Sequence, residues 1–229
     1  MRLIIILLLS VVLTSLVLWA ADHRTSVRLT TDKGDILIEL YNETPRHRDN
    51  FIKLCQNHFY DSLIFHRVIA GFMIQTGDPK SKGADLNIPL GDGGPGYDLP
   101  AEIRFPQFFH KRGALAAARE SDSTNPDRRS SGSQFYIVWG KRISNNELDD
   151  IATSVKLNTG QNLSWPDSIR LIYRKQGGTP YLDGQYSVFG EVVEGLDVVN
   201  KIQKAVTVDN DRPYHDVVIL KTEVVHASH

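Results

Sequence analysis

The longest apolar pattern in the chain covers residues 3–21, at its start. One arginine precedes this run, Ala20 and Ala21 close it, and polar residues follow. A short basic start, an apolar run and small residues at its end are typical of a secretory signal peptide. At about 1.5 Å per residue, the run is also nearly long enough to span a bilayer as a helix. We therefore expect residues 1–21 to be a signal peptide or an uncleaved anchor, which would make residues 3–21 a membrane tether.

Beyond the leader, the pattern predicts a β-hairpin followed by a helix. Residues 27–30 and 35–40 flank a turn at residues 32–34, and apolar residues recur at every second position of the later segment. Such alternation is typical of a strand with one buried face. Thr44-Pro45 then supplies an N-cap and a first-turn proline, so we expect a helix over residues 45–56.

Most of the remaining chain consists of short apolar runs separated by turn residues, which predict further strands. A second helix is expected over residues 195–202. Many short strands with two principal helices indicate a mainly β domain, either a closed antiparallel barrel or a sandwich. The runs are residues 63–69, 71–75, 114–118, 135–139, 187–193 and 217–225.

The strand pattern lapses over residues 141–180. Asn146 could cap one helix, Trp165-Pro166 could start another, and Gly177-Gly178 would end it. We interpret this segment as a helical insertion between two strands of a single domain that covers residues 22–229.

Charge and cysteine content exclude several classes of function. Lys and Arg number 26 and Asp and Glu number 27, a net charge of −1, whereas a nucleic-acid binder needs a basic surface. The single cysteine, Cys55, falls on the apolar stripe of the first predicted helix and allows neither a disulfide framework nor a Cys-rich zinc site. Because the eight histidines show no metal-binding spacing, we expect no metal and no cofactor.

Two motifs that suggest other chemistry lack their context. The glycine-rich run at residues 91–96 contains Pro95 and is followed by residues 97–100, which end in a proline and do not predict a helix. It therefore predicts a surface loop and not a phosphate site. Ser133 does not stand in the Gly-x-Ser-x-Gly pattern of a hydrolase nucleophile.

The segment over residues 65–78 combines an arginine with an apolar strand. Arg67 stands beside His66 and is followed by Val68 and Ile69, which places a guanidinium against a hydrophobic surface. Taken alone, this pattern also fits an arginine whose stem packs and whose head makes an ordinary ion pair.

Together with later motifs, this segment strongly resembles the cyclophilins, the cyclosporin-binding family of peptidyl-prolyl cis-trans isomerases. The later motifs occupy residues 113–119, 132–137, 182–190 and 195–199, and the similarity spans roughly residues 27–226. The resemblance implies a closed eight-stranded antiparallel β-barrel capped by two α-helices, with the site on its outer face. Minimal members of the family have no counterpart of the insertion at residues 141–180.

The resemblance also implies the site residues. Arg67 would be the principal catalytic residue, with His66 and Gln75 beside it. The substrate groove would contain Phe72, Met73, Ala118, Arg119, Gln134, Tyr136, Tyr181, Leu182 and Tyr186. Tyr181 stands where many eukaryotic members have tryptophan, which puts tight cyclosporin binding in doubt.

The chemistry of prolyl isomerisation explains why such residues suffice. Rotation about an amide bond faces a barrier of about 18–20 kcal/mol because resonance stiffens the C–N bond. Arg67 can donate to the prolyl nitrogen or the adjacent carbonyl in the twisted state, and its charge does not change with pH. Gln75 and Gln134 would hold the peptide backbone and orient Arg67. No covalent bond and no metal are required.

We therefore predict an exported, monomeric isomerase of the periplasm or cell envelope. Its partners would be proline-containing segments of unfolded or folding proteins, and its role would be to assist protein folding like a chaperone. The alternative is a catalytically weak module that binds proline peptides as a scaffold or holdase.

Overall fold

The computed structural model describes residues 24–225, so the predicted leader at residues 1–21 lies outside the described residues. Within the described part, no helix is both long enough and apolar enough to cross a bilayer. The elements in chain order are β1 (Ser26–Thr31), β2 (Gly34–Leu40), α2 (Pro45–Gln56), β3 (Arg67–Ile69), β4 (Met73–Thr76), η1 (Pro79–Ser81), β5 (Asp98–Leu99), β6 (Ala114–Ala117), β7 (Ser130–Ser131), β8 (Phe135–Val138), α3 (Asn145–Thr159), α4 (Asp167–Lys175), η2 (Pro180–Leu182), β9 (Val188–Glu194), α5 (Leu196–Ile202), η3 (Asp209–Asp211) and β10 (Ile219–Val225).

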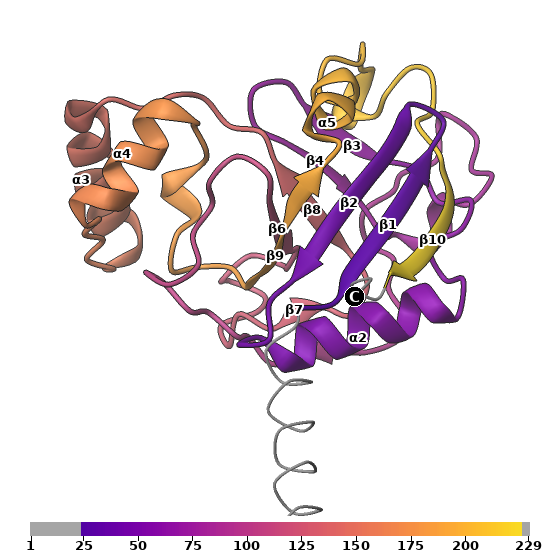
Figure 1. Cartoon of the computed structure of the whole chain (residues 1–229), viewed down its shortest axis with the longest axis horizontal. Helices are drawn as coiled ribbons and strands as arrows, with labels where there is room; N and C mark the ends of the chain where they lie inside the picture. Colours follow the sequence, from indigo (N-terminus) through magenta and orange to yellow (C-terminus); the bar gives the residue numbers. More distant parts are fainter. Residues whose placement is uncertain (1–23, 226–229) are drawn as a thin grey trace, which may run out of the picture.

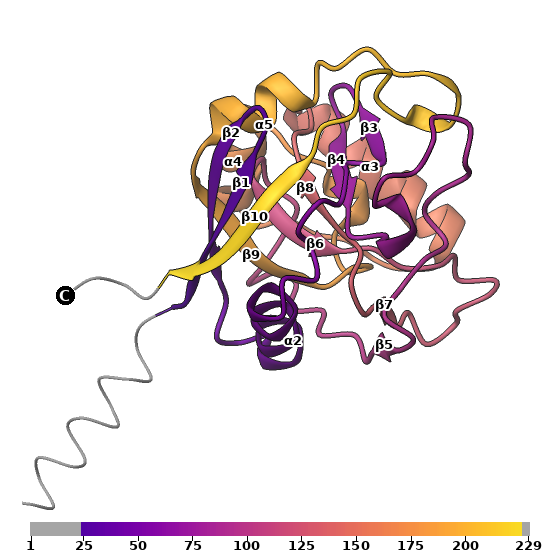
Figure 2. The same ribbon diagram turned by 90° about the vertical axis from the view of Figure 1, so that its right-hand side faces the viewer.

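Eight strands form one curled antiparallel sheet in the order β10-β1-β2-β9-β6-β8-β4-β3 (Figure 1). A separate two-stranded sheet pairs β5 with β7. Ser26 of β1 pairs with Val225 of β10, so the two ends of the described chain lie side by side (Figure 2). The prediction of a mainly β fold with eight antiparallel strands is confirmed.

The outer strands β3 and β10 are not paired with each other, but the segment before β3 connects the two edges. The Ser62 amide donates to the Ile219 carbonyl at 2.7 Å, and the Phe65 amide donates to the Val217 carbonyl at 2.9 Å. The Ile219 amide donates in return to the Leu63 carbonyl at 2.8 Å. The sheet therefore curls into a barrel-like shape whose edges are joined outside its regular strands.

The concave side of the sheet holds the main core. Val27, Leu29, Ile36 and Ile38 alternate along β1 and β2 and are completely buried. Helix α2 closes one end of this core and α5 the other (Figure 1). Helix α2 has the predicted bounds, and Cys55 is buried on its inner side as expected.

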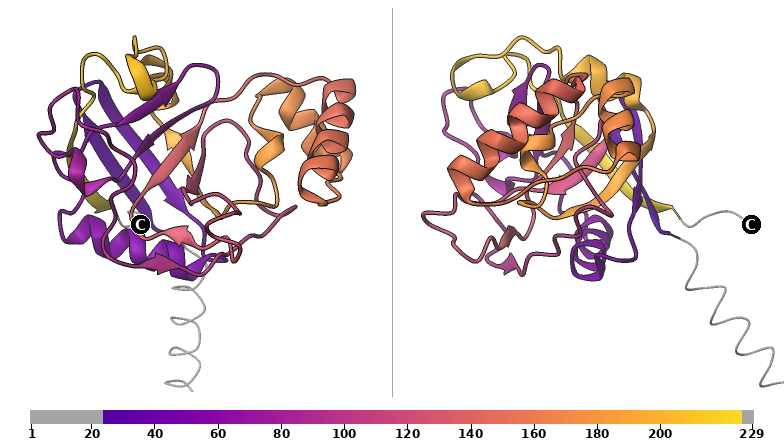
Figure 3. Two further views of the ribbon diagram at one scale, coloured as in Figure 1. Left: turned by 180° about the vertical axis from the view of Figure 1, so that it is seen from behind. Right: turned by 90° about the vertical axis from the view of Figure 1, so that its left-hand side faces the viewer.

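Helices α3 and α4 confirm the helical insertion and lie beside the sheet, away from α2 and α5 (Figure 3). They have an apolar cluster of their own, formed by Leu148, Val155, Leu163, Trp165, Ile169 and Tyr173. The insertion is therefore a compact helical segment with its own apolar cluster, and not an extended loop.

Helix α3 starts one residue earlier than its predicted cap. Asn146 lies inside the helix, and Ser144 is the N-cap. The Ser144 hydroxyl accepts a hydrogen bond from the Glu147 amide, and the Glu147 carboxylate accepts one from the Ser144 amide. This reciprocal capping box satisfies two N-terminal donors, which a cap at Asn146 would leave open.

Candidate active site on the outer face of the sheet

Four neighbouring strands place one row of side chains on the outer face. Arg67 of β3 pairs with Gln75 of β4, and Gln75 pairs with Tyr136 of β8. Tyr136 pairs in turn with Ala116 of β6. Because alternate residues of a strand point to opposite faces, all four belong to the face opposite the main core. The sequence brings an arginine, an amide and a phenol together in this way.

A pocket of about 140 Å³ opens over this row. Its volume is below the ~300–1,000 Å³ typical of drug-sized ligand sites, so it suits a single small ring. Its lining combines apolar and aromatic side chains with two arginines, Arg67 and Arg119. The lining residues are Arg67, Phe72, Met73, Gln75, Ala118, Arg119, Tyr136, Leu182 and Tyr186.

Two larger hollows adjoin the pocket. One of about 410 Å³ shares Gln75, Ala118 and Arg119 with it. The other, of about 630 Å³, shares Arg67 and is also lined by His66. The three hollows share lining residues and therefore lie next to one another, and we refer to them together as the groove.

Asp211 of η3 holds the Arg67 guanidinium. Its Oδ2 accepts a hydrogen bond from Arg67 Nε at 3.3 Å, and both side chains are about half exposed. Because the contact uses Nε, the two terminal amino groups of Arg67 remain for a ligand. The ion pair therefore orients the guanidinium of Arg67 and leaves its two terminal amino groups available as donors.

The two site glutamines bind each other and a loop. Gln75 Nε2 donates to Gln134 Oε1 at 3.0 Å. Gln134 Nε2 donates to the carbonyls of Gly91 and Gly93, at 2.8 and 2.7 Å. The glycine-rich run is thus a loop without a following helix, as predicted, and it forms a wall of the groove.

Arg119 and Tyr186 contact each other in the wall of the pocket. The Arg119 side chain is 4% exposed, and its guanidinium lies 4.5 Å from the centre of the Tyr186 ring. It also donates from Nε to the Gln185 carbonyl at 3.0 Å. Burial raises the pKa of Tyr136 well above its ordinary value, so its phenol is neutral.

His66 precedes Arg67 and does not line the small pocket. Its side chain is 3% exposed, and burial lowers its pKa to about 4. Histidine is therefore neutral here at neutral pH. Within residues 24–225, no group of three or more His, Cys, Asp and Glu side chains is arranged to hold a metal ion.

The sequence model of the family described as "Cyclophilin type peptidyl-prolyl cis-trans isomerase/CLD" matches residues 26–224. That match covers most of the chain. The chain belongs to the cyclophilin family. Its enzyme class is therefore that of the peptidyl-prolyl cis-trans isomerases.

Relatives of this cyclophilin agree with that assignment. One from Staphylococcus epidermidis, named as a peptidyl-prolyl cis-trans isomerase, is 34% identical over 206 residues, which are 89% of this chain and 93% of the relative. One from Staphylococcus aureus with the same name is 35% identical over 199 residues, which are 86% of this chain and 90% of the relative.

Solved structures show the same fold. A cyclophilin type peptidyl-prolyl cis-trans isomerase of Cryptosporidium parvum has a TM-score of 0.64 at 23% identity, covering 90% of this chain and 100% of its own. A structure of that protein in the presence of the dipeptide Ala-Pro has a TM-score of 0.62 at 25% identity, covering 89% and 99%.

Nine of the twelve predicted site residues line the small pocket of this cyclophilin. The other three do not. Gln134 lies beside Gln75, His66 lines the neighbouring hollow, and Tyr181 lies at the rim, 41% exposed, with its ring centre 5.9 Å from that of Phe72.

Three polar residues near the groove do not appear in the sequence-based prediction. Asp211 holds Arg67, the role that we predicted for Gln75 and Gln134. His110 and Asp183 lie beneath the pocket wall. Asp211 is 144 positions from Arg67, so no local pattern connects them. The only signal in the sequence is that an arginine whose stem packs on apolar residues can place its head in an ion pair.

Proposed function

We propose that this cyclophilin accelerates cis-trans isomerisation of X-Pro bonds in unfolded or folding proteins, with Arg67 as the catalytic residue. The observation that carries the proposal is the 140 Å³ pocket with Arg67 at its edge. Phe72, Met73 and Leu182 would grip the pyrrolidine ring, which leaves the prolyl nitrogen close to the guanidinium. The C. parvum relative obtained with Ala-Pro supports a proline peptide as the ligand class.

Catalysis would come from electrostatic stabilisation of the twisted bond. At the top of the barrier the prolyl nitrogen loses resonance and regains a lone pair, which the outer amino groups of Arg67 can bind. A group that binds the twisted state better than the planar one raises kcat. The reaction as proposed makes no covalent bond and uses no metal.

Substitution of the arginine tests this role. We expect Arg67→Ala to lower kcat/KM on an Ala-Pro peptide about 100-fold or more, because removal of one oriented charge-stabilising donor typically has such an effect. A protease-coupled assay measures it. The matched control is Arg28→Ala, which removes an arginine from a 3.4 Å ion pair with Asp35 elsewhere in the sheet. Equal activity of both variants would contradict the role of Arg67, and would favour a binding scaffold if peptides still bind.

We further propose that the protein acts outside the cytoplasm, in the periplasm or cell envelope, as a monomer. The apolar run at residues 3–21 supports the export part of this proposal. Intact mass of the exported protein distinguishes the two forms of the leader. Loss of about 20 residues indicates cleavage, a full-length mass in the membrane fraction indicates an anchor, and a full-length mass in the cytoplasm contradicts export.

A further inference from the structure

A buried carboxylate connects the insertion to the wall of the pocket. Asp183 follows pocket residue Leu182 and is completely buried. Its Oδ1 accepts hydrogen bonds from the His110 amide at 2.8 Å and from His110 Nδ1 at 2.9 Å. Its Oδ2 accepts from Trp165 Nε1 at 2.7 Å and from the Tyr173 hydroxyl at 2.6 Å. The carboxylate is thus shared between His110 and two residues of the insertion.

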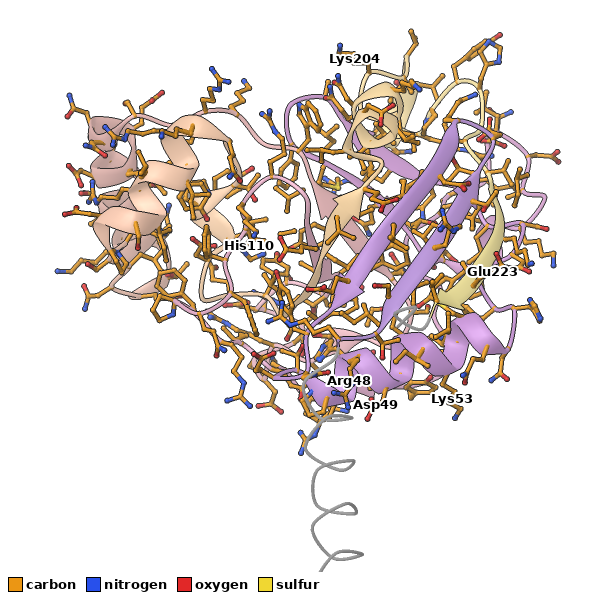
Figure 4. All side chains as sticks on the ribbon, viewed as in Figure 1. Arg48, Asp49, Lys53, His110, Lys204 and Glu223 are labelled. Atoms are coloured by element: carbon orange, nitrogen blue, oxygen red, sulfur yellow. The ribbon has the colours of Figure 1, made fainter. Side chains whose placement is uncertain are left out.

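His110 contacts both Asp183 and a residue that lines the groove, Tyr136. Figure 4 shows His110 between the insertion and the sheet. Its Nε2 lies 3.0 Å from the hydroxyl oxygen of Tyr136, and the two rings are stacked with centres 6.1 Å apart. Tyr136 meets Tyr186 edge to face at 5.9 Å, and both tyrosines line the pocket.

The donors and acceptors leave one arrangement for a neutral imidazole. Asp183 can only accept, so His110 Nδ1 carries the proton and Nε2 is the acceptor. Tyr136 must then donate its O–H to Nε2. This bond turns the hydroxyl proton away from the groove and fixes the orientation of the ring.

Burial of a carboxylate is costly unless it is fully hydrogen-bonded, and apolar residues can join two packed layers equally well. A network of this kind therefore suggests a task beyond attachment of the insertion. The only member of it that reaches the ligand pocket through its side chain is the Tyr136 ring.

We propose that Asp183 and His110 are positioning residues that hold Tyr136 in the pocket wall, and that Trp165 and Tyr173 thereby make the insertion a working part of the site. This inference rests on the proposed isomerase function. If the network is broken, the Tyr136 hydroxyl loses its buried partner, the ring moves, and the pocket fits a prolyl ring less well.

A double-mutant cycle separates positioning from mere structural support. Trp165→Phe/Tyr173→Phe removes both insertion donors and keeps an aromatic side chain at each position, and neither residue lines the pocket. We expect about a fivefold to tenfold fall in kcat/KM on an Ala-Pro peptide, mainly through KM, as the loss of buried hydrogen bonds would give. In a Tyr136→Phe background the same pair should have no further effect. An equal loss in both backgrounds would overturn the proposal.

Controls keep the cycle interpretable. Thr153→Ala removes the hydrogen bond that the Thr153 hydroxyl donates to the Asp149 carbonyl in α3. We expect this variant to leave kcat/KM unchanged. Thermal unfolding measures whether each variant is folded. If the double variant is unfolded, the two single substitutions are used in its place.

A readout independent of catalysis is the tautomer of His110. We expect ¹⁵N NMR of the wild-type protein to show a proton on Nδ1 of His110 and none on Nε2, and Asp183→Asn to populate the Nε2–H form. If the wild-type protein is inactive, the proposed function fails, but this spectrum and Ala-Pro peptide titration still test the network. A wild-type ring protonated at Nε2 would contradict the inference.

Discussion

His66 shows how burial sets the state of a residue beside the site. Burial is the main cause of its low pKa, with a further lowering by the charge of Arg67 and an opposing effect of Asp78. The imidazole therefore stays neutral while Arg67 next to it stays charged. At neutral pH His66 is therefore an uncharged, buried neighbour of Arg67.

The low pKa of His66 predicts a loss of stability in acid. Its ordinary value is 6.5 and its value in the folded protein is about 4. Between these values the unfolded chain binds a proton that the folded protein excludes, so acidification favours unfolding over this window. We expect wild type to lose about 2–3 kcal/mol more than His66→Gln between pH 7.5 and pH 4.5. Urea unfolding at both pH values measures the difference, and parallel losses would contradict the low pKa.

Residue identities in the pocket could be predicted because the short motifs that contain them resemble those of the cyclophilins. The polar partners beneath them could not. Asp183 adjoins the Leu182 motif, but nothing in its neighbours indicates that four donors from distant segments converge on it. The burial of Asp183 depends on how the insertion packs on the sheet, which the local sequence does not determine.

The short segment η3 is an element whose backbone conformation places a carboxylate beside Arg67. Asn210 and Asp211 both have left-handed backbone angles, with φ of 63° and 61°. Asparagine and aspartate tolerate this conformation better than most residues. The turn thereby brings the Asp211 carboxylate to Arg67 Nε.

Asp211→Asn tests this contact without a change in backbone preference. We expect a fall of about threefold to tenfold in kcat/KM with little effect on stability, because a half-exposed ion pair contributes little to folding. Peptide assays and urea unfolding measure the two quantities. Asp35→Asn, which breaks the comparable Arg28–Asp35 pair, is the control. If both variants retain full activity, Asp211 does not orient Arg67.

Whether a segment is a helix or a strand follows from its local pattern of apolar and polar residues. Where a strand ends depends on which neighbouring strand it pairs with. The helix at residues 45–56 was predicted at its true bounds because Thr44-Pro45 marks its start. The run at residues 63–69 was expected to be one strand, but only Arg67–Ile69 pairs with β4. Residues 63–65 bond to residues 217–219 instead, a choice that local sequence does not determine. The two-residue strands β5 and β7 are too short to leave a pattern.

At the scale of the whole molecule, the two faces of the sheet differ in what they carry. Its inner face and the ends closed by α2 and α5 hold the core, while its outer face carries the groove. The overall near-neutral charge fits this arrangement, because the proposed chemistry needs one oriented cation and an apolar pocket. The insertion adds a second apolar cluster beside the groove, connected to it through Asp183.

The central claim is that the protein catalyses rotation of X-Pro bonds, and NMR exchange spectroscopy on an Ala-Pro peptide tests it most directly. With a small molar fraction of the wild-type protein, we expect cis and trans signals to exchange within a second, against tens to hundreds of seconds without it. The cis-to-trans ratio should stay unchanged, because a catalyst accelerates both directions equally. Binding of the peptide with no increase in exchange rate would contradict the account.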